Sequence, residues 1–212
     1  MDSDLARGAV FMTVEQIASE YGVSRTIARE AASQLQALGL LKGRKRVGLV
    51  MHRPHMQDIM KNWLPLYSRS LGDESIQSVA ELRYVLELGA IGLAVRNATL
   101  EQTIGLREIA ARFEEVTSAF GQTDEADVAE YEFHSLLLEM TGNPLVSGLH
   151  AVLADYFRMA IGQNPKWPSV SQTAVWEHKA IANAIAERDV ELARSLLRHH
   201  LDNSLAELKN TE

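Results

Sequence analysis

Residues 13–41 constrain the fold most, because their pattern predicts two short helices joined by a tight turn. Thr13 is a residue type that caps helix N-termini, and Gln16, three positions later, can complete a capping box. The first helix is expected to end at Gly22, since glycine adopts the left-handed conformation of a sharp turn without a clash from a Cβ atom. Ser24 is placed to cap the second helix. The segment therefore predicts a helix-turn-helix.

The second helix is expected to bury one face and to present polar residues at its start. The apolar residues that recur at spacings of three and four are Ile27, Ala28, Ala31, Leu35 and Leu38. Arg25, Thr26 and Arg29 are expected to project from the exposed first turns. Cationic forks and a hydroxyl at this end of a helix can reach phosphates and guanine edges in a major groove. The pattern therefore indicates a recognition helix.

A basic β-hairpin is expected directly after this helix. Residues 42–46 are rich in Lys and Arg, and a short β-prone run that contains Gly48 follows them. Arg44 and Arg46 could reach the DNA backbone or the minor groove from such a hairpin. Two helices followed by a basic hairpin make up a winged helix-turn-helix. The alternative is a helical hairpin in the core of an unrelated protein.

These motifs resemble those of the GntR family of bacterial transcription regulators. The family's glycine-valine-serine-arginine turn, arginine-glutamate-alanine recognition helix, glycine-leucine exit and glycine-valine wing correspond to residues 22–25, 29–31, 39–40 and 48–50. The resemblance implies that the DNA-binding residues are Arg25, Thr26, Arg29, Arg44, Arg46 and Gly48. The family's first helix lies mostly upstream of the Gly8 position, so the first helix of this domain is expected to be incomplete.

The distribution of charge favours two domains. Residues 1–53 have eight Lys or Arg and five Asp or Glu, about +3, whereas the rest has thirteen and twenty-three, about −10. Phosphate neutralisation supplies most non-specific DNA affinity, so the basic end is the candidate nucleic-acid face. The absence of cysteine favours a reducing compartment, and no signal peptide or membrane-length apolar run is found. A cytoplasmic location is expected.

The rest of the chain shows helical patterns and no β pattern. Pro54 marks a plausible boundary, which predicts a winged domain at 1–53, a linker and connecting helix at 54–74, and an all-α domain at 75–212. Amphipathic stretches alternate there with capping residue types. The expected helices span residues 56–70, 75–97, 99–120, 123–141, 143–161, 171–187 and 189–209. The fold class expected is mainly α, with a winged helix-turn-helix followed by a helical bundle.

Four residues of the second domain could bind a metal ion. Glu130 and His134 are four residues apart, so they lie on the same face of a helix, and His178 and His200 lie on the last two helices. If these faces turn inward, three imidazoles and a carboxylate would meet, which suits zinc, nickel or manganese. On spacing alone, an ordinary surface pair also explains Glu130 and His134.

Residues 75–205 resemble the FCD domain, the C-terminal ligand-binding domain of the FadR subgroup. The motifs that carry this resemblance are residues 130–134, 141–144, His178 and 200–201. In members that bind metal, an aspartate and three histidines hold the ion, and Glu130, His134, His178 and His200 fall on these positions, with glutamate in place of aspartate. Arg83 resembles the arginine that faces the effector pocket; its alternative role is an ion pair with Glu87.

The resemblance implies a metabolite-responsive regulator, a repressor that binds palindromic operator DNA as a homodimer. A divalent ion and Arg83 would together recognise a small carboxylate such as a hydroxy acid or keto acid. Two alternatives remain, a metal-dependent hydrolase and a non-catalytic dimerisation protein without metal. Against an enzyme, the sequence has no HExxH motif, nucleophile elbow or paired acid-base carboxylates, so no catalytic residue is predicted.

Overall fold

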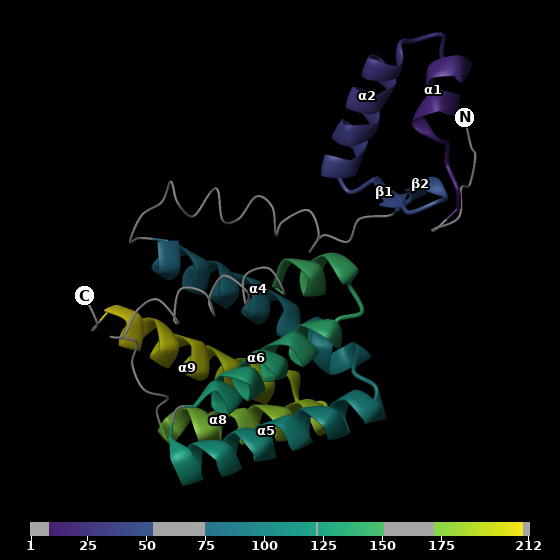
Figure 1. Cartoon of the computed structure of the whole chain (residues 1–212). Coiled ribbons are helices and arrows are strands. Elements are labelled where there is room, and N and C mark those ends of the chain that lie inside the picture. Colours follow the sequence, from purple (N-terminus) through teal and green to yellow (C-terminus); the bar gives the residue numbers. More distant parts are fainter. Residues whose placement is uncertain (1–8, 53–74, 122, 151–171, 210–212) are drawn as a thin grey trace. The chain divides into compact units, whose positions relative to one another are not determined.

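The computed structural model describes residues 9–52, 75–121, 123–150 and 172–209 (Figure 1). The chain divides into two compact units, residues 1–63 and residues 64–212. The expected helix at 56–70 lies outside the described residues. The expected domain boundaries and the incomplete first helix stay predictions.

The N-terminal unit contains the predicted helix-turn-helix. Its elements are α1 (Val14–Glu20), α2 (Arg25–Ala37), β1 (Leu41–Arg44) and β2 (Gly48–Met51). The capping box at the start of α1 is confirmed: the Gln16 N–H donates to Thr13 Oγ1 at 3.2 Å, and the Thr13 N–H donates to Gln16 Oε1 at 2.7 Å. Gly22 has a φ of 62° in the turn, and Ser24 caps α2. Local sequence therefore determines both helix starts.

The buried face of α2 differs from the expected one. Ala28 and Ala32 are buried and Leu35 is half-buried. The other expected members of the face are exposed, namely Ile27, Ala31 and Leu38. The prediction was right for Ala28 and Leu35 and wrong for these three residues, because it counted every apolar residue near the stripe. Alanines allow α2 to pack closely against α1 and β1.

The predicted wing is present. Strands β1 and β2 are antiparallel, with Leu41 opposite Met51 and Arg44 opposite Gly48. The segment 9–12 lies along the other side of β2, where the Phe11 N–H donates to the Leu49 carbonyl at 2.8 Å. Both Leu41 and Leu49 are buried in the core of this unit, against the helices. The wing is therefore an integral part of the N-terminal core.

The second unit is all-helical among the described residues, as predicted. Its named helices are α4 (Ser75–Asn97), α5 (Leu100–Phe120), α6 (Asp124–Glu139), α8 (Gln172–Ala186) and α9 (Val190–Lys209). Each begins and ends within two residues of its expected range. Residues 144–150 are also helical, and the remainder of the helix expected at 143–161 lies outside the described residues. Thr99 and Thr123 cap α5 and α6 through their side chains.

The helices pack around a common core. Helix α5 packs against α6 and α8, α4 packs against α9, and α8 packs against α9 (Figure 1). The turn between α8 and α9 is held to the end of α4 by Arg188, whose guanidinium donates to the carbonyls of Val95 and Ala98. Asp189 accepts from the Leu192 N–H and starts α9. These contacts fix the relative positions of three helices that contribute to the candidate site.

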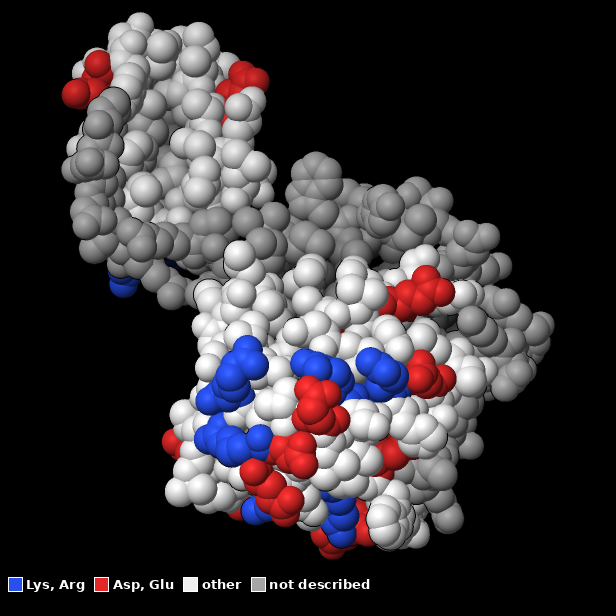
Figure 2. Space-filling model, turned by 180° about the vertical axis from the view of Figure 1, so that it is seen from behind, with Lys and Arg blue, Asp and Glu red and all other residues white. Residues whose placement is uncertain are grey.

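Charges of both signs lie side by side on the face of the helical unit in Figure 2. Exposed ion pairs of this unit are Arg112 with Glu132, Lys179 with Glu114, and Arg194 with Glu191. Such pairs contribute little to stability. The face in Figure 2 does not present the continuous basic patch that DNA binding requires. None of the helices among the described residues is long and apolar enough to cross a membrane.

Candidate metal centre and nucleic-acid interface

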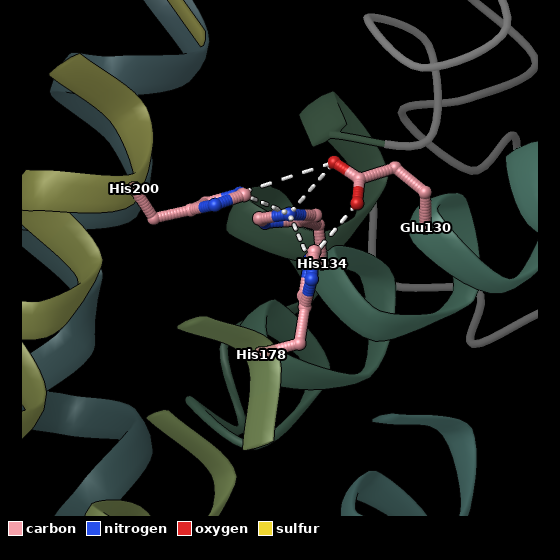
Figure 3. Close-up of side chains that lie close together, drawn as sticks. All are labelled: Glu130, His134, His178 and His200. Atoms are coloured by element: carbon pink, nitrogen blue, oxygen red, sulfur yellow. Dashed lines mark hydrogen bonds and ion pairs between the residues drawn. The ribbon is translucent and has the colours of Figure 1, made fainter. Parts of the chain in front are cut away.

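The four predicted ligands come from three helices and meet in the second unit (Figure 3). Glu130 and His134 project from α6, His178 from α8 and His200 from α9. One ligand atom of each residue lies within 4.8 Å of those of the other three. The three histidines are 0–2% exposed, whereas the side chain of Glu130 is 27% exposed. The inward orientation that the sequence left open is thus the one observed.

The imidazole Nε2 atoms point toward one another. His134 Nε2 lies 3.4 Å from His178 Nε2 and 3.2 Å from His200 Nε2. The Glu130 carboxylate completes the group, with Oε2 at 2.9 Å from His178 Nε2 and Oε1 at 3.2 Å from His134 Nε2. Phe113 and Phe133 contact the His178 ring edge-on and hold its plane. The result is a compact set of three nitrogen ligands and one oxygen ligand.

Two buried carboxylates lie behind the histidines. His134 Nδ1 is 2.6 Å from Glu87 Oε2 on α4, and His200 Nδ1 is 2.8 Å from Glu177 Oε2 on α8. An ionised carboxylate only accepts, so each Nδ1 bears a hydrogen, and when the ring is neutral its Nε2 bears a lone pair. Carboxylate–histidine pairs of this kind typically support metal ligands.

Arg83 lies next to the cluster and joins two of its acids. Its Nε donates to Glu87 Oε1 at 2.8 Å, and its Nη2 donates to Glu130 Oε1 at 3.2 Å. The ion pair with Glu87, which was the alternative role for Arg83, is therefore present. This ion pair does not exclude a role for Arg83 at the site, because the same guanidinium also donates to Glu130, a predicted ligand.

Sequence reasoning missed the roles of Glu87 and Glu177. A signal existed for each, since Glu87 follows the predicted effector residue by one helical turn and Glu177 directly precedes His178. His150 is also buried, and its Nε2 lies 3.7 Å from Glu87 Oε1. His199, the neighbour of His200 in the sequence, has a side chain that is 70% exposed.

The electrostatics of the cluster favour a positive charge at its centre. Burial by itself raises the pKa of Glu87, but His134 and Arg83 outweigh it and hold the pKa well below its ordinary range. The pKa of Glu130 is lowered in the same way, against burial, by His178 and His134. Burial lowers the pKa of His200 to about 4 despite its hydrogen bond with Glu177, so the neutral form of this ring is favoured. Burial and Arg83 by themselves lower the pKa of His134, but Glu87 and Glu130 outweigh them and raise this pKa, so a divalent ion would displace a proton from this ring.

Five of the six predicted DNA-binding residues are exposed on the N-terminal unit. Arg25, Thr26 and Arg29 are exposed on the first turns of α2, and Arg44 and Arg46 are exposed in the wing. Gly48 has a conformational role as well: its φ is 105°, and a Cβ atom there would lie 3.2 Å from Thr13 Cγ2. Glycine at this position thus lets the wing pass close to the capped start of α1.

Two family models match the chain. The model described as "Bacterial regulatory proteins, gntR family" matches residues 4–51, and the FCD domain matches residues 78–203, more than half of the chain. The HTH-type transcriptional regulator LutR of Bacillus subtilis is 26% identical over 208 residues, which cover 95% of this chain and 92% of that protein. The HTH-type transcriptional repressor NanR of Cronobacter sakazakii is 25% identical over 209 residues, which cover 96% of this chain and 78% of that protein.

A solved structure supports the fold. The GntR protein of Streptococcus agalactiae aligns with a TM-score of 0.70 and 20% sequence identity, over 96% of this chain and 92% of that one. At this identity the likeness shows the fold alone.

The families and the similar regulators exclude the metal-dependent hydrolase that the sequence left as an alternative. The protein therefore belongs to the GntR family of bacterial transcription regulators, as a member with a winged helix-turn-helix and an FCD domain, and it is not an enzyme.

Proposed function

We propose that this regulator is a repressor that binds palindromic operator DNA as a homodimer and responds to a small carboxylic acid through a divalent metal ion in its helical domain. The metal ligands are Glu130, His134, His178 and His200. The observation that carries this proposal is the convergence of three buried imidazole nitrogens and one carboxylate within 4.8 Å. FCD domains often bind metal, which supports it further.

The charge of the cluster favours a divalent ion. Glu130 belongs to the cluster, and the carboxylates of Glu87 and Glu177 accept hydrogen bonds from its histidines. The guanidinium of Arg83 lies among them, so a net charge of two negative units remains when the imidazoles are neutral. An uncompensated buried charge is costly, and a divalent cation removes this imbalance. Nitrogen and carboxylate ligands suit zinc, nickel and manganese, and the absence of cysteine disfavours softer ions.

Arg83 supports the carboxylate part of the proposal. Its planar fork can hold a carboxylate in two hydrogen bonds, and it already contacts the carboxylates of Glu87 and Glu130. A metal that takes five or six ligands leaves positions open beside the four protein groups. A hydroxy acid or keto acid could occupy them while Arg83 holds its carboxylate.

The N-terminal unit supports the DNA-binding part. Arg25, Thr26 and Arg29 are placed to reach base edges or adjacent phosphates, and Arg44 and Arg46 to reach the backbone or minor groove. One recognition helix buries little DNA surface, so two copies on a palindromic site give the specificity that a regulator needs. Repression and a cytoplasmic location are proposed by analogy with the similar regulators, of which NanR is named a repressor.

Binding of the acid must change DNA affinity to act as a signal. A ligand shifts a conformational equilibrium only by its differential affinity for the two states, and allosteric coupling typically amounts to roughly 1 to 3 kcal/mol. The ligands come from α6, α8 and α9, so an acid at the metal can bias three helices at once.

The test uses the full chain and a duplex selected from a randomised library. Metal content, circular dichroism and duplex binding with a panel of carboxylic acids are measured on wild type, His134→Ala, His178→Ala and Glu130→Ala. We expect the histidine variants to lose metal and the response to acids together while they keep the helical fold, and Glu130→Ala to have a milder effect. A metal-free His178→Ala protein with a full response would refute the proposal. Wild type without stoichiometric metal, and with unchanged melting on chelation, would favour the dimerisation protein.

A further inference from the structure

Glu87 is a fully buried carboxylate that must accept from two different donors. Its Oε1 accepts from Arg83 Nε at 2.8 Å and its Oε2 accepts from His134 Nδ1 at 2.6 Å. The side chain is 0% exposed, so water does not replace either partner. A guanidinium has donors and no acceptor, and Oε1 is thereby committed to accepting. Only a group with two acceptor ends satisfies this position.

We infer that Glu87 is the positioning residue that sets the tautomer of His134 and so makes its Nε2 available to the metal. The inference rests on the proposed metal site. Accepting from Nδ1 places the ring hydrogen on that nitrogen and leaves the Nε2 lone pair directed at His178 and His200. Because the other oxygen of Glu87 holds Arg83, one carboxylate connects a metal ligand with the proposed effector contact.

Glutamine at position 87 cannot satisfy both donors. If its NH2 group faces Arg83, two donors oppose each other in a buried place. If its NH2 group faces His134 instead, Nδ1 must accept, the ring hydrogen moves to Nε2, and this nitrogen can no longer bind a cation. Glu87→Gln keeps the size and shape of the side chain, so either arrangement reports on hydrogen-bond polarity rather than on packing.

Glu177 offers a matched comparison within the same cluster. It also backs a histidine, since its Oε2 accepts from His200 Nδ1 at 2.8 Å, and its Oε1 accepts from Asn203 Nδ2 at 2.7 Å. Asn203 is an amide, which can rotate and present its oxygen instead. Glu177→Gln removes the same charge, yet its carbonyl can still accept from His200 while its NH2 group donates to the rotated Asn203.

A second substitution should restore the tautomer. The Oε1 or Nε2 atom of a glutamine at position 83 occupies the place of Arg83 Nε, because each is bonded to Cδ. In the double variant Arg83→Gln/Glu87→Gln, the amide at 83 can accept from the NH2 group at 87, and the carbonyl at 87 can again accept from His134 Nδ1. A residue that merely filled space would not be rescued in this way.

The experiment measures Zn²⁺ affinity of the full-length protein by competition with a chromophoric chelator. We expect Glu87→Gln to bind Zn²⁺ about 10- to 100-fold more weakly than wild type, the range for loss of a hydrogen-bond partner behind a metal ligand. Glu177→Gln should lose less affinity than Glu87→Gln, because it removes the same charge while its hydrogen bonds can be remade. Arg83→Gln also loses the hydrogen bond to Glu130, so it serves as the reference for the double variant. The double variant should bind within about tenfold of Arg83→Gln. Visible spectra with Co²⁺ should show one nitrogen ligand fewer in Glu87→Gln alone.

The outcomes separate this inference from the proposed function. Wild type that fails to bind Zn²⁺ or Co²⁺ refutes the metal site itself. Metal binding in wild type with equal losses in Glu87→Gln and Glu177→Gln refutes the positioning role and leaves the metal site standing. If circular dichroism shows that Glu87→Gln alone does not fold, the double variant decides. Zn²⁺ binding by the double variant that is much weaker than by Arg83→Gln overturns the inference.

Discussion

Removal of His178 should greatly reduce the stabilisation that a bound metal would give to the helical unit. The four ligands come from α6, α8 and α9 and span residues 130 to 200, so the unfolded chain does not hold them together. An ion that binds only the folded state stabilises it by about 2.7 kcal/mol when the free ion is a hundredfold above Kd. This corresponds to a rise in Tm of about 5 to 11 °C for a domain of this size.

His178→Ala leaves two imidazoles and Glu130. If that lowers affinity about a hundredfold, the same concentration of ion contributes only about 0.4 kcal/mol, which raises Tm by under about 2 °C. The substitution also removes a buried ring that packs on Phe113 and Phe133, and this lowers the stability of the metal-free protein. The packing loss is common to the metal-bound and chelated samples, so it cancels in the difference between their Tm values.

Differential scanning calorimetry with added Zn²⁺ and with chelator provides the measurement. His199→Ala is the control, since His199 is adjacent in sequence to a proposed ligand but is 70% exposed, and it should keep the full metal-dependent shift. A His178→Ala protein whose Tm still rises by the wild-type amount on addition of metal would show that this histidine is not a ligand.

Three further predictions concern the N-terminal unit. Arg29→Ala should lower affinity for the selected duplex by about 1 to 3 kcal/mol if the side chain reads a guanine; unchanged anisotropy titrations at fixed salt would exclude that role. Arg44→Ala should reduce the salt slope of binding by about 1 without changing sequence preference; an unaltered slope would remove this residue from the phosphate contacts. Gly48→Ala should destabilise the unit by more than about 1 kcal/mol, given its φ of 105° and the nearby Thr13; chemical denaturation with no loss of stability would contradict it.

Helix positions were predictable because their signals are local. Thr13, Ser24, Thr99 and Thr123 each cap the helix that follows, and the hydrogen bond involved spans only three residues. The orientation of a helix face is less local. Ile27 and Ala28 are both apolar neighbours on α2, and the choice of Ala28 for the core depends on how closely α1 and β1 approach.

The convergence of the four candidate ligands was predictable, but the carboxylates behind the histidines were not. The order and spacing of Glu130, His134, His178 and His200 suggested the group, and the family resemblance decided against a surface pair. The burial of Glu87 could not be read in the same way, because a glutamate four residues after an arginine is typical of an exposed helix. Its burial results from the packing of α4 against α6, which places it behind His134.

The uneven exposure of the four ligands has a consequence for exchange kinetics. The histidines are almost completely enclosed, and Glu130, paired with Arg83, borders the solvent. If an ion binds there, it would leave past a carboxylate that is also held by a guanidinium, and its release would be slow. Such an ion would stay in the folded protein longer than the organic acid does. The speed of the transcriptional response would then follow the arrival and loss of the organic acid rather than fluctuations in the cell's free metal.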